Sequence, residues 1–310
     1  MRRTAAAAIC LTLAIFLFPS ASAQQRGRGA PPPPAIPRNV APVDVAGTYV
    51  SVVTEDWRWR MVTPRKGDYT SLPISAEGRR VADAWDIAKD EAAGEACKPF
   101  GVGGIIRQPG RIQVAWQDDQ TLKVDFDAGT QTRMLSFDKS KRPGAEKTWQ
   151  GYSTAEWEGP VGRGAGPGGR GGDGRTDARL LTGEAAARAG GGTGFAGVPG
   201  GGGAGLRGGP GVRTAPLDSG IIKVTTSNFR EGYLRKNGVP YSENAQITEY
   251  FQWLPPHPNG DVWLVVTTAI EDSKYLTQPF YTSTHFKKEA NASKWSPSPC
   301  KTDSPAPPVK

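Results

Sequence analysis

The residue types best suited to binding lie in one short run, Glu55-Asp56-Trp57-Arg58-Trp59-Arg60. Its alternation is typical of a strand, which would place the two tryptophans on one side and the two arginines on the other. Trp57 and Trp59 would then form the floor of a pocket for a ring-containing ligand. Arg58 and Arg60 would bind a carboxylate or phosphate. The alternative is a pair of core tryptophans beside two solvated arginines.

A second candidate site lies in residues 232–243, a polar segment that we expect to be a loop between strands. Because loops carry function more often than strands do, Tyr241, Ser242 and Glu243 become ligand-binding candidates. The alternative is a turn held by side-chain hydrogen bonds. Trp116, one of nine tryptophans, is expected on a strand and completes the candidate ligand-binding set.

Signatures of several enzyme classes are absent from the sequence. Neither His257 nor His285 belongs to an HExxH pattern, and no P-loop, GxSxG elbow or cysteine–histidine cluster suited to zinc occurs. We therefore predict no metal and no cofactor, and we assign no catalytic residue. Glu271 and Asp272 could form an acid pair or bind a cation, although a solvated turn accounts for them more simply.

Alternating apolar residues predict the strands that would hold these candidates. Residues 112–116 and 122–126 flank a polar turn and form a hairpin, and residues 133–137 continue the sheet. Further strands are expected at the following positions: 47–49, 149–157, 221–227, 245–253, 262–270 and 280–287. One short helix is predicted over residues 75–93, with Ser75 as its N-cap.

This pattern predicts a mainly β protein. About eight to ten antiparallel strands must protect their edges, and an up-and-down barrel does so by closing on itself. Gly47-Thr48-Tyr49 at the first strand is similar to the Gly-x-Trp that opens lipocalins, which favours a calycin-like barrel. Residues 45–158 and 217–300 together have the size of a single domain.

Low-complexity segments surround and interrupt this domain. Residues 24–44 are predicted to be a disordered Pro- and Gly-rich tether, and residues 301–310 a disordered tail. Residues 159–216 hold 23 glycines, and seven arginines against three acids, so they are predicted to be a disordered insertion. This arm could touch a polyanion, although a tolerated surface insertion is the simpler interpretation.

The first 23 residues have the parts of a cleavable secretory signal. Arg2 and Arg3 precede an apolar run that is too short to span a bilayer, and Ala21-Ser22-Ala23 offers a cleavage site after Ala23. We expect a periplasmic or secreted protein with no transmembrane segment after cleavage. Its net charge of +8 would fall to +6, which permits weak contact with anionic envelope surfaces, while export argues against nucleic acid.

Cleavage would leave two cysteines, Cys97 and Cys300. Two thiols in an oxidising compartment most often pair, so we predict a structural disulfide, the alternative being two cysteines that never meet. The chain-entropy model predicts roughly 4 to 5 kcal/mol from closing so long a loop.

Several longer motifs carry a family resemblance. They are Trp149-Gln150-Gly151-Tyr152-Ser153, Glu156-Trp157-Glu158-Gly159, Gly238-Val239-Pro240-Tyr241-Ser242-Glu243, Ile247-Thr248-Glu249-Tyr250-Phe251, residues 271–280, His285-Phe286 and Cys300. In these the chain resembles a family of exported β-rich proteins from acidobacteria and other environmental bacteria. The resemblance implies a fold and an exported location but no activity. Some relatives carry His-Ser-Glu where this chain has Tyr241-Ser242-Glu243, which weakens any catalytic histidine there.

Three hypotheses of function follow. The first is a binding module that holds a small apolar or aromatic ligand in the interior or mouth of the barrel. The second is a periplasmic enzyme that uses Glu and Asp for acid–base chemistry, with Tyr241 or Arg58 as orienting groups. The third is an envelope scaffold whose basic arm contacts a polymer or another protein. A barrel interior filled by side chains would argue against a ligand held inside it.

Overall fold

The computed structural model describes residues 35–158 and 219–305. The predicted signal peptide (1–23), the predicted insertion (159–216), and residues 24–34 and 306–310 of the predicted tether and tail lie outside the described residues. Residues 35–44, the rest of that predicted tether, lie against the barrel. The Trp157 indole donates a hydrogen bond to the Pro37 carbonyl at 3.0 Å, and Val43 packs on the core.

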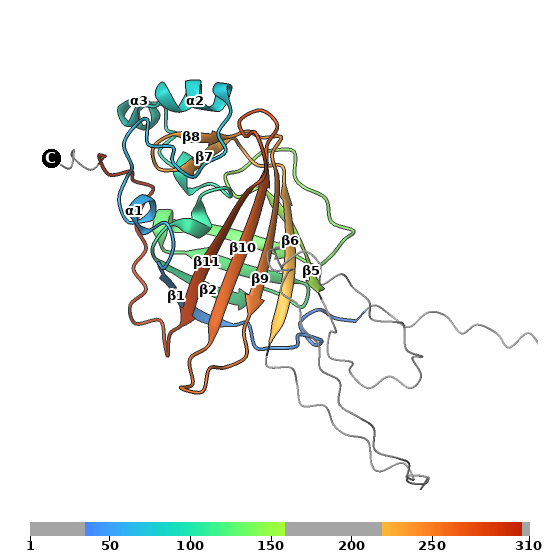
Figure 1. The fold of residues 1–310 in the computed structure, drawn as a ribbon. Coiled ribbons are helices and arrows are strands. Elements are labelled where there is room, and N and C mark those ends of the chain that lie inside the picture. Colours follow the sequence, from blue (N-terminus) through green and yellow to red (C-terminus); the bar gives the residue numbers. More distant parts are fainter. Residues whose placement is uncertain (1–34, 159–218, 306–310) are drawn as a thin grey trace, which may run out of the picture. The chain divides into compact units, whose positions relative to one another are not determined.

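Nine strands close into a barrel in the described part of the chain (Figure 1). This confirms the mainly β class and the closed barrel, and every predicted strand except the one expected at residues 57–60 corresponds to a strand of the structure. In order around the barrel they are β1 Gly47–Val52, β11 Phe280–Lys288, β10 Trp263–Glu271, β9 Gln246–Trp253, β6 Gly220–Ser227, β5 Tyr152–Glu158, β4 Gln131–Ser136, β3 Thr121–Phe126 and β2 Arg111–Trp116.

The barrel is mixed, which corrects the prediction of a wholly antiparallel, up-and-down sheet. β4 and β5 pair in parallel through two residue pairs, Leu135 with Ser153 and Ser136 with Thr154, whereas the neighbouring β3–β4 and β5–β6 pairs are antiparallel. Antiparallel neighbours alternate in direction, so a closed ring with an odd number of strands must contain at least one parallel pair. The long connection from β4 to β5 follows from this constraint, because parallel strands need a crossover.

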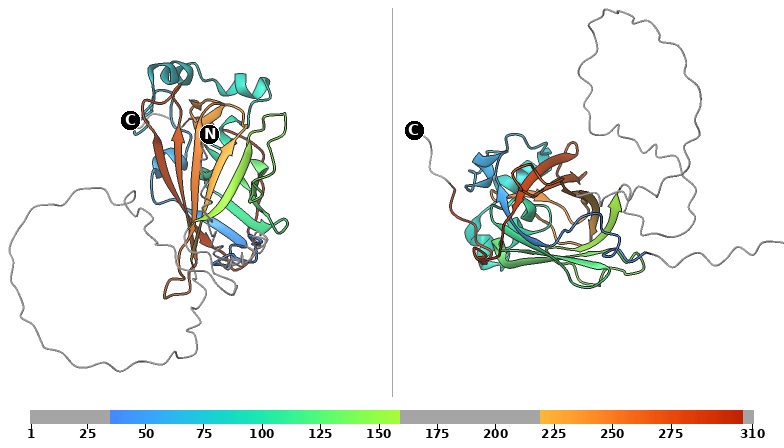
Figure 2. Two further views of the ribbon diagram at one scale, coloured as in Figure 1. Left: turned by 90° about the vertical axis from the view of Figure 1, so that its right-hand side faces the viewer. Right: turned by 90° about the horizontal axis from the view of Figure 1, so that it is seen from below.

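Short helices and a hairpin gather at one end of the barrel and form a cap (Figures 1 and 2). The cap contains α1 Trp57–Arg60, α2 Ala76–Asp83, α3 Ile87–Ala92, the 3₁₀ turns η1 Lys98–Phe100 and η2 Ile105–Arg107, and the hairpin of β7 Gly232–Arg235 with β8 Val239–Tyr241. Most of it is the connection between β1 and β2, and the hairpin comes from the connection between β6 and β9.

The single helix predicted over residues 75–93 is two helices. Ser75 caps α2 as predicted, since its Oγ accepts a hydrogen bond from the Gly78 amide at 3.1 Å. Asp86 then starts α3 by accepting from the Ala88 amide at 3.0 Å. Trp85, between the helices, is buried against Gly238, and packs so closely on it that a Cβ at this position would lie 2.3 Å from the tryptophan side chain. Trp85 is therefore held against the β7–β8 hairpin, at the position through which one continuous helix over residues 75–93 would have to run.

Two apolar clusters form the core, one inside the barrel and one under the cap. Inward-facing residues of β9 show the division, because Phe251 belongs to the barrel cluster and Ile247 to the cap cluster, with Glu249 between them. The same order holds in β10, where Thr268 separates Val266 from Ile270. A buried polar layer therefore crosses the barrel interior.

An ion pair occupies this layer. The Arg133 guanidinium of β4 contacts both Glu249 carboxylate oxygens, at 3.1 and 2.5 Å, and both side chains are almost completely buried. Arg133 also donates to Thr226 Oγ1 at 3.2 Å, and this hydroxyl bonds Ser153 Oγ at 2.8 Å. The interior is filled by side chains at this level and at both apolar levels beside it.

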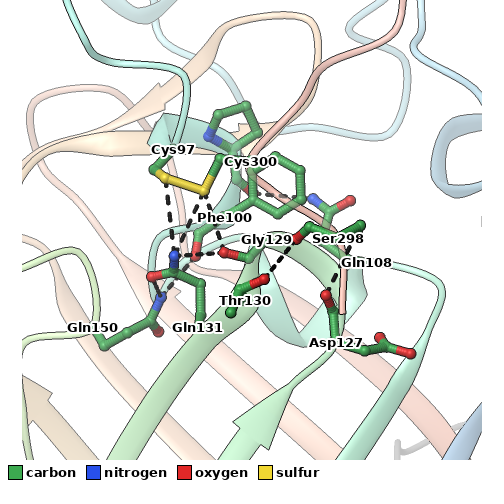
Figure 3. Close-up of a disulfide and its surroundings, with 11 residues drawn as sticks. Cys97, Phe100, Gln108, Asp127, Gly129, Thr130, Gln131, Gln150, Ser298 and Cys300 are labelled. Atoms are coloured by element: carbon green, nitrogen blue, oxygen red, sulfur yellow. Dashed lines mark hydrogen bonds between the residues drawn. A yellow bond between two sulfur atoms is a disulfide. The ribbon is translucent and has the colours of Figure 1, made fainter. Parts of the chain in front are cut away.

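The predicted disulfide between Cys97 and Cys300 is present (Figure 3). It ties the C-terminal segment to Cys97, the residue before η1 in the cap. Cys300 also lies beside the turn η3, Ala128–Thr130, between β3 and β4, with its Sγ 3.5 Å from the Gly129 carbonyl oxygen. Beside it, Thr130 Oγ1 donates to the Ser298 carbonyl at 2.9 Å, and the Ser298 amide donates to the Asp127 carbonyl at 2.8 Å. The segment that follows β11 is thus fastened to the cap by one covalent bond and to the β3–β4 turn by several hydrogen bonds.

Replacing Cys97 and Cys300 together by serine should lower the free energy of unfolding by about 4 to 5 kcal/mol, because the bond closes a loop of 203 residues in the unfolded chain. Urea denaturation of the double variant and of the oxidised parent measures the difference. A change below about 1 kcal/mol would contradict the chain-entropy argument.

Replacing Glu249 alone by leucine should cost about 3 to 5 kcal/mol, because it leaves Arg133 buried without a counter-ion. Replacing the pair together, Arg133→Met with Glu249→Leu, should recover most of this loss. Denaturant unfolding of both single variants and the double variant completes the cycle. Additive losses would show that the two side chains do not act as a pair.

Candidate functional site

Three arginines from separate cap elements are buried together. Arg60 is the last residue of α1, Arg107 ends η2 and Arg235 ends β7, and their side chains lie around one hollow. They are 3%, 6% and 5% exposed, respectively. Arginine is rarely buried unless it is paired, so three of them in one place need an explanation.

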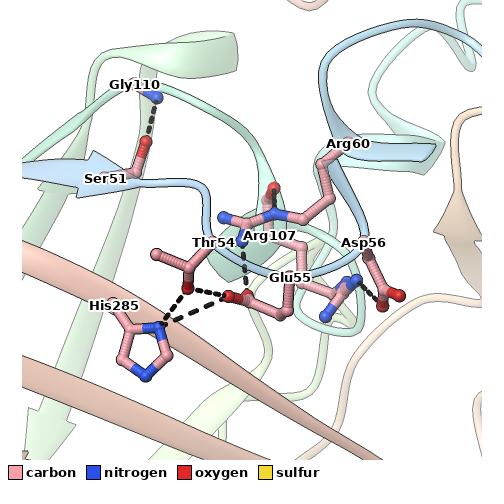
Figure 4. A network of polar contacts seen from close by, with 8 residues as sticks. All are labelled: Ser51, Thr54, Glu55, Asp56, Arg60, Arg107, Gly110 and His285. Carbon is pink, nitrogen blue, oxygen red and sulfur yellow. Dashed lines mark hydrogen bonds and ion pairs between the residues drawn. The ribbon is translucent and has the colours of Figure 1, made fainter. Parts of the chain in front are cut away.

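Each arginine has some hydrogen-bond partners. Arg60 donates to Glu55 at 2.5 Å and to the Arg107 carbonyl at 3.0 Å, and Arg107 donates to Asp56 at 2.6 Å (Figure 4). Arg235 donates to the Thr70 carbonyl at 2.9 Å. The charges of Arg60 and Arg107 are thus matched by carboxylates, whereas Arg235 bonds a neutral carbonyl.

Four buried N–H-bearing atoms of these guanidinium groups have no hydrogen-bond partner among the described residues. They are Arg60 Nη2, Arg107 Nη1, Arg235 Nε and Arg235 Nη2. The hollow beside them is also lined by Trp59, Gly104, Gln108, Leu234 and Lys236, and its volume is about 10 Å³. That is room for about one water molecule or one ligand oxygen. Buried donors without acceptors are costly, so the hollow favours an acceptor.

The electrostatics of the cluster point the same way. Burial lowers the pKa of Arg235 to about 10, with Asp56 opposing the shift and Arg107 adding to it. Burial also lowers the pKa of Arg60, and Arg107 contributes to that shift as well. Both effects arise because positive charge is held away from water and near like charge. An anion in the hollow would relieve them.

Trp59 forms one wall of the hollow. The Arg235 guanidinium lies over the Trp59 ring, 4.5 Å from its centroid, and the Trp59 indole N–H donates a hydrogen bond to Asp68 at 3.1 Å. Arg58, in contrast, is exposed and pairs with the same Asp68 at 2.9 Å. Of the four residues predicted here as ligand-binding, Trp59 and Arg60 line the hollow, while Trp57 and Arg58 face solvent.

The expectation of a strand over residues 57–60 is wrong. Met61 N–H bonds the Trp57 carbonyl at 2.9 Å, so this run is one turn of helix. Neighbours two positions apart point in different directions on a helix, which separates Trp57 from Trp59. Four alternating residues are too few to distinguish the two periods.

The same turn is anchored to the barrel wall. His285 Nδ1 of β11 lies 2.9 Å from Thr54 Oγ1 and 3.3 Å from Glu55, and Thr54 donates to Glu55 at 2.7 Å (Figure 4). Glu55 in turn holds Arg60. This chain of contacts fixes the entry to α1 against β11, and His285 has a positioning role within it.

The second candidate segment, residues 232–243, contains a buried hairpin where a loop was expected. Its three predicted ligand-binding residues do not converge. Tyr241 is buried in the cap cluster, where burial raises its pKa, and packs edge-to-face on Phe229. Ser242 donates to Asp272 at 3.0 Å, and Glu243 is exposed on Lys147 at 2.7 Å.

Trp116 lies at the end of β2, away from the arginine hollow. It is half-buried and packs on Phe137 with ring centroids 5.6 Å apart. The acids considered for acid–base chemistry are dispersed as well. Glu249 pairs with Arg133 inside the barrel, and Glu271 is exposed at the end of β10.

Arg107 and Arg235 are the site residues that the sequence analysis missed. Arg107 follows an apolar pair, Ile105-Ile106, and Arg235 follows Tyr233-Leu234, so each ends a short buried run. In a sequence, a charged residue at the end of a short apolar run is only a weak signal of a binding site. Only the fold brings them to Arg60, which lies 47 and 175 positions away in the sequence.

Residues 35–158 and 219–305 contain no group of three or more His, Cys, Asp or Glu side chains that could hold a metal ion. No helix among them is long and apolar enough to cross a membrane. Comparisons with protein-family models, curated proteins and solved structures found no match. The fold therefore stands as a nine-stranded β-barrel without an identified family, and the family resemblance stays a prediction.

Glu55→Gln should lower the free energy of unfolding by about 2 to 3 kcal/mol, because it removes the carboxylate that accepts from buried Arg60. The matched control is Glu77→Gln, which removes the carboxylate of the exposed Arg80 pair and should leave stability unchanged. Thermal and urea unfolding measure both. Equal effects of the two variants would show that burial of Arg60 does not matter.

Proposed function

We propose that this protein is an exported binding protein whose arginine hollow takes an oxyanion, the carboxylate or phosphate group of a small molecule. One observation carries the proposal: Arg60, Arg107 and Arg235, which together carry four buried N–H-bearing atoms without acceptors, line a single hollow. Guanidinium groups bind carboxylates and phosphates through paired hydrogen bonds, so these three groups match such an anion in charge and in the type of donor.

The charge balance supports an anion. Four cations line the hollow: Arg60, Arg107, Arg235 and Lys236. Two of them are bonded to carboxylates, Arg60 to Glu55 and Arg107 to Asp56. Burial lowers the pKa of Lys236 as well. A bound anion would offset this surplus in a place that water screens poorly.

The size of the hollow restricts how a ligand binds. Its volume of about 10 Å³ accepts one oxygen atom, so the rest of the ligand would lie outside, over Trp59 and Lys236. Trp59 is half-buried and offers an aromatic surface there. In this proposal the predicted small aromatic ligand lies at the mouth of the barrel. The interior is filled by the polar layer and the apolar residues beside it, which disfavours a ligand inside.

The test uses Arg235, which, unlike Arg60 and Arg107, has no carboxylate partner within residues 35–158 and 219–305. Inorganic phosphate and benzoate should raise the melting temperature of the parent protein in a buffer without other oxyanions. Arg235→Met should weaken binding of either anion about tenfold to a hundredfold, because this is the loss of affinity expected when hydrogen bonds to a charged group are removed. It should leave the stability of the free protein unchanged or raised, because it removes a desolvated like charge.

Isothermal titration calorimetry of the parent, Arg235→Met and Arg80→Met completes this test. Arg80 is exposed on α2, so its variant removes the same charge without touching the hollow and should bind like the parent. If Arg235→Met binds phosphate and benzoate as tightly as Arg80→Met does, the proposed function is wrong.

A further inference from the structure

The exposed apolar side chains of the protein are concentrated in one short segment. In the part of the chain that the structure describes, six large apolar residues are exposed, and three of them lie within residues 57–62. Trp57 is 67%, Met61 55% and Val62 46% exposed. The other three, Ile36, Met134 and Tyr281, are distant from this segment in the sequence. Such clustering marks an interaction surface, whereas isolated exposed apolar residues do not.

The helical turn α1 creates this arrangement. The Met61 amide bonds the Trp57 carbonyl at 2.9 Å, so these side chains, four positions apart, lie on the same outer face. The opposite face holds Trp59 and Arg60 against the arginine hollow. The turn therefore buries one of its arginines, Arg60, and exposes one of its tryptophans, Trp57, whereas an ordinary surface helix buries its apolar residues.

Cationic residues are near the apolar group in the sequence. Arg58, Arg65 and Lys66 are all exposed, and Arg58 is paired with Asp68 at 2.9 Å. The acids at the start of the turn point inward instead, Glu55 to Arg60 and Asp56 to Arg107. We call the exposed set the α1 surface: Trp57, Arg58, Met61, Val62, Arg65 and Lys66. It combines an indole, two apolar side chains and a cationic border.

We propose that the α1 surface docks on an anionic phospholipid bilayer. Tryptophan favours the boundary between headgroups and acyl chains, and arginine and lysine are attracted to anionic headgroups. The whole chain carries a net charge of +8, which becomes +6 from Gln24 onward because Arg2 and Arg3 are removed, and this charge adds long-range attraction to such a surface. A single turn presents too little apolar area for permanent insertion, so the contact is peripheral and reversible.

This inference goes beyond the proposed function and does not rest on it. The docking residues are exposed, and none of them lines the arginine hollow, to which α1 contributes Trp59 and Arg60. Lipid docking would hold the hollow close to a membrane without using its arginines. The two ideas therefore fail separately.

The experiment is co-sedimentation of the chain from Gln24 onward with lipid vesicles, which excludes the apolar leader and keeps all described residues. Vesicles of phosphatidylcholine mixed with phosphatidylglycerol should bind the protein, and binding should fall with added salt. Vesicles of phosphatidylcholine alone should bind at least about tenfold more weakly, because they offer no net charge to the cationic border. Trp57→Ser and Met61→Gln should each weaken binding about tenfold or more, the effect of withdrawing one large apolar side chain.

Matched controls carry the same chemical change elsewhere. Tyr281, 66% exposed, and Met134, 42% exposed, lie on the barrel strands β11 and β4. Tyr281→Ser and Met134→Gln should bind vesicles like the parent. Since all four side chains are exposed, melting temperatures should be unchanged, which separates lost docking from lost folding.

The outcomes decide the proposal. Loss of vesicle binding in Trp57→Ser and Met61→Gln, with both controls unaffected, supports it. Equal binding by Trp57→Ser and Tyr281→Ser, or equal binding to charged and uncharged vesicles, overturns it. Self-association of the parent that Trp57→Ser abolishes, without vesicle binding, would assign the α1 surface to a second copy of the chain instead. Arg235→Met should retain vesicle binding, so failure of the oxyanion site leaves this result intact.

Discussion

The buried ion pair between Arg133 and Glu249 is the constraint on which the barrel depends. It joins β4 to β9 across the interior, and therefore joins the part of the domain before residues 159–218 to the part after them. The parallel contact of β4 with β5 involves only two residue pairs, the weakest seam of the barrel. Arg133 bridges this seam through Ser153 and Thr226 on β5 and β6. An apolar core would close the barrel without specifying which strands meet there, whereas a buried charge accepts one arrangement.

The polar layer also explains why the cap is a separate structure. It divides the apolar core, so the cap needs its own cluster, which includes Phe229, Tyr241 and Leu276. That cluster, together with the Trp85–Gly238 contact, holds the hairpin β7–β8 on the helices. Arg235 at the end of β7 is thereby brought to Arg60 and Arg107. The barrel thus positions the irregular segments that carry the three buried arginines.

The strands could be predicted from the sequence because each inward-facing series is long and regular. Ile112, Val114 and Trp116 are an example, and these residues form the inward-facing side of β2. Prediction failed where the signal was short or depended on distant residues. The Trp57–Arg60 run has too few residues to reveal its period, and Arg107 and Arg235 meet only after folding. The ion pair left a trace, since Glu249 stands at an inward position between Ile247 and Phe251, but its partner could not be named from one strand alone.

Over Trp57–Arg60, a strand and a helical turn would give the same residues different functions. A strand would have placed both tryptophans in one pocket and both arginines opposite them. The turn sends Trp59 and Arg60 inward and Trp57 outward, so adjacent residues serve two surfaces. Its entry is fixed by Glu55, which contacts His285 on one side and Arg60 on the other. Any movement of this turn would alter the buried arginine cluster and the exposed indole together, because one hydrogen-bonded loop carries both.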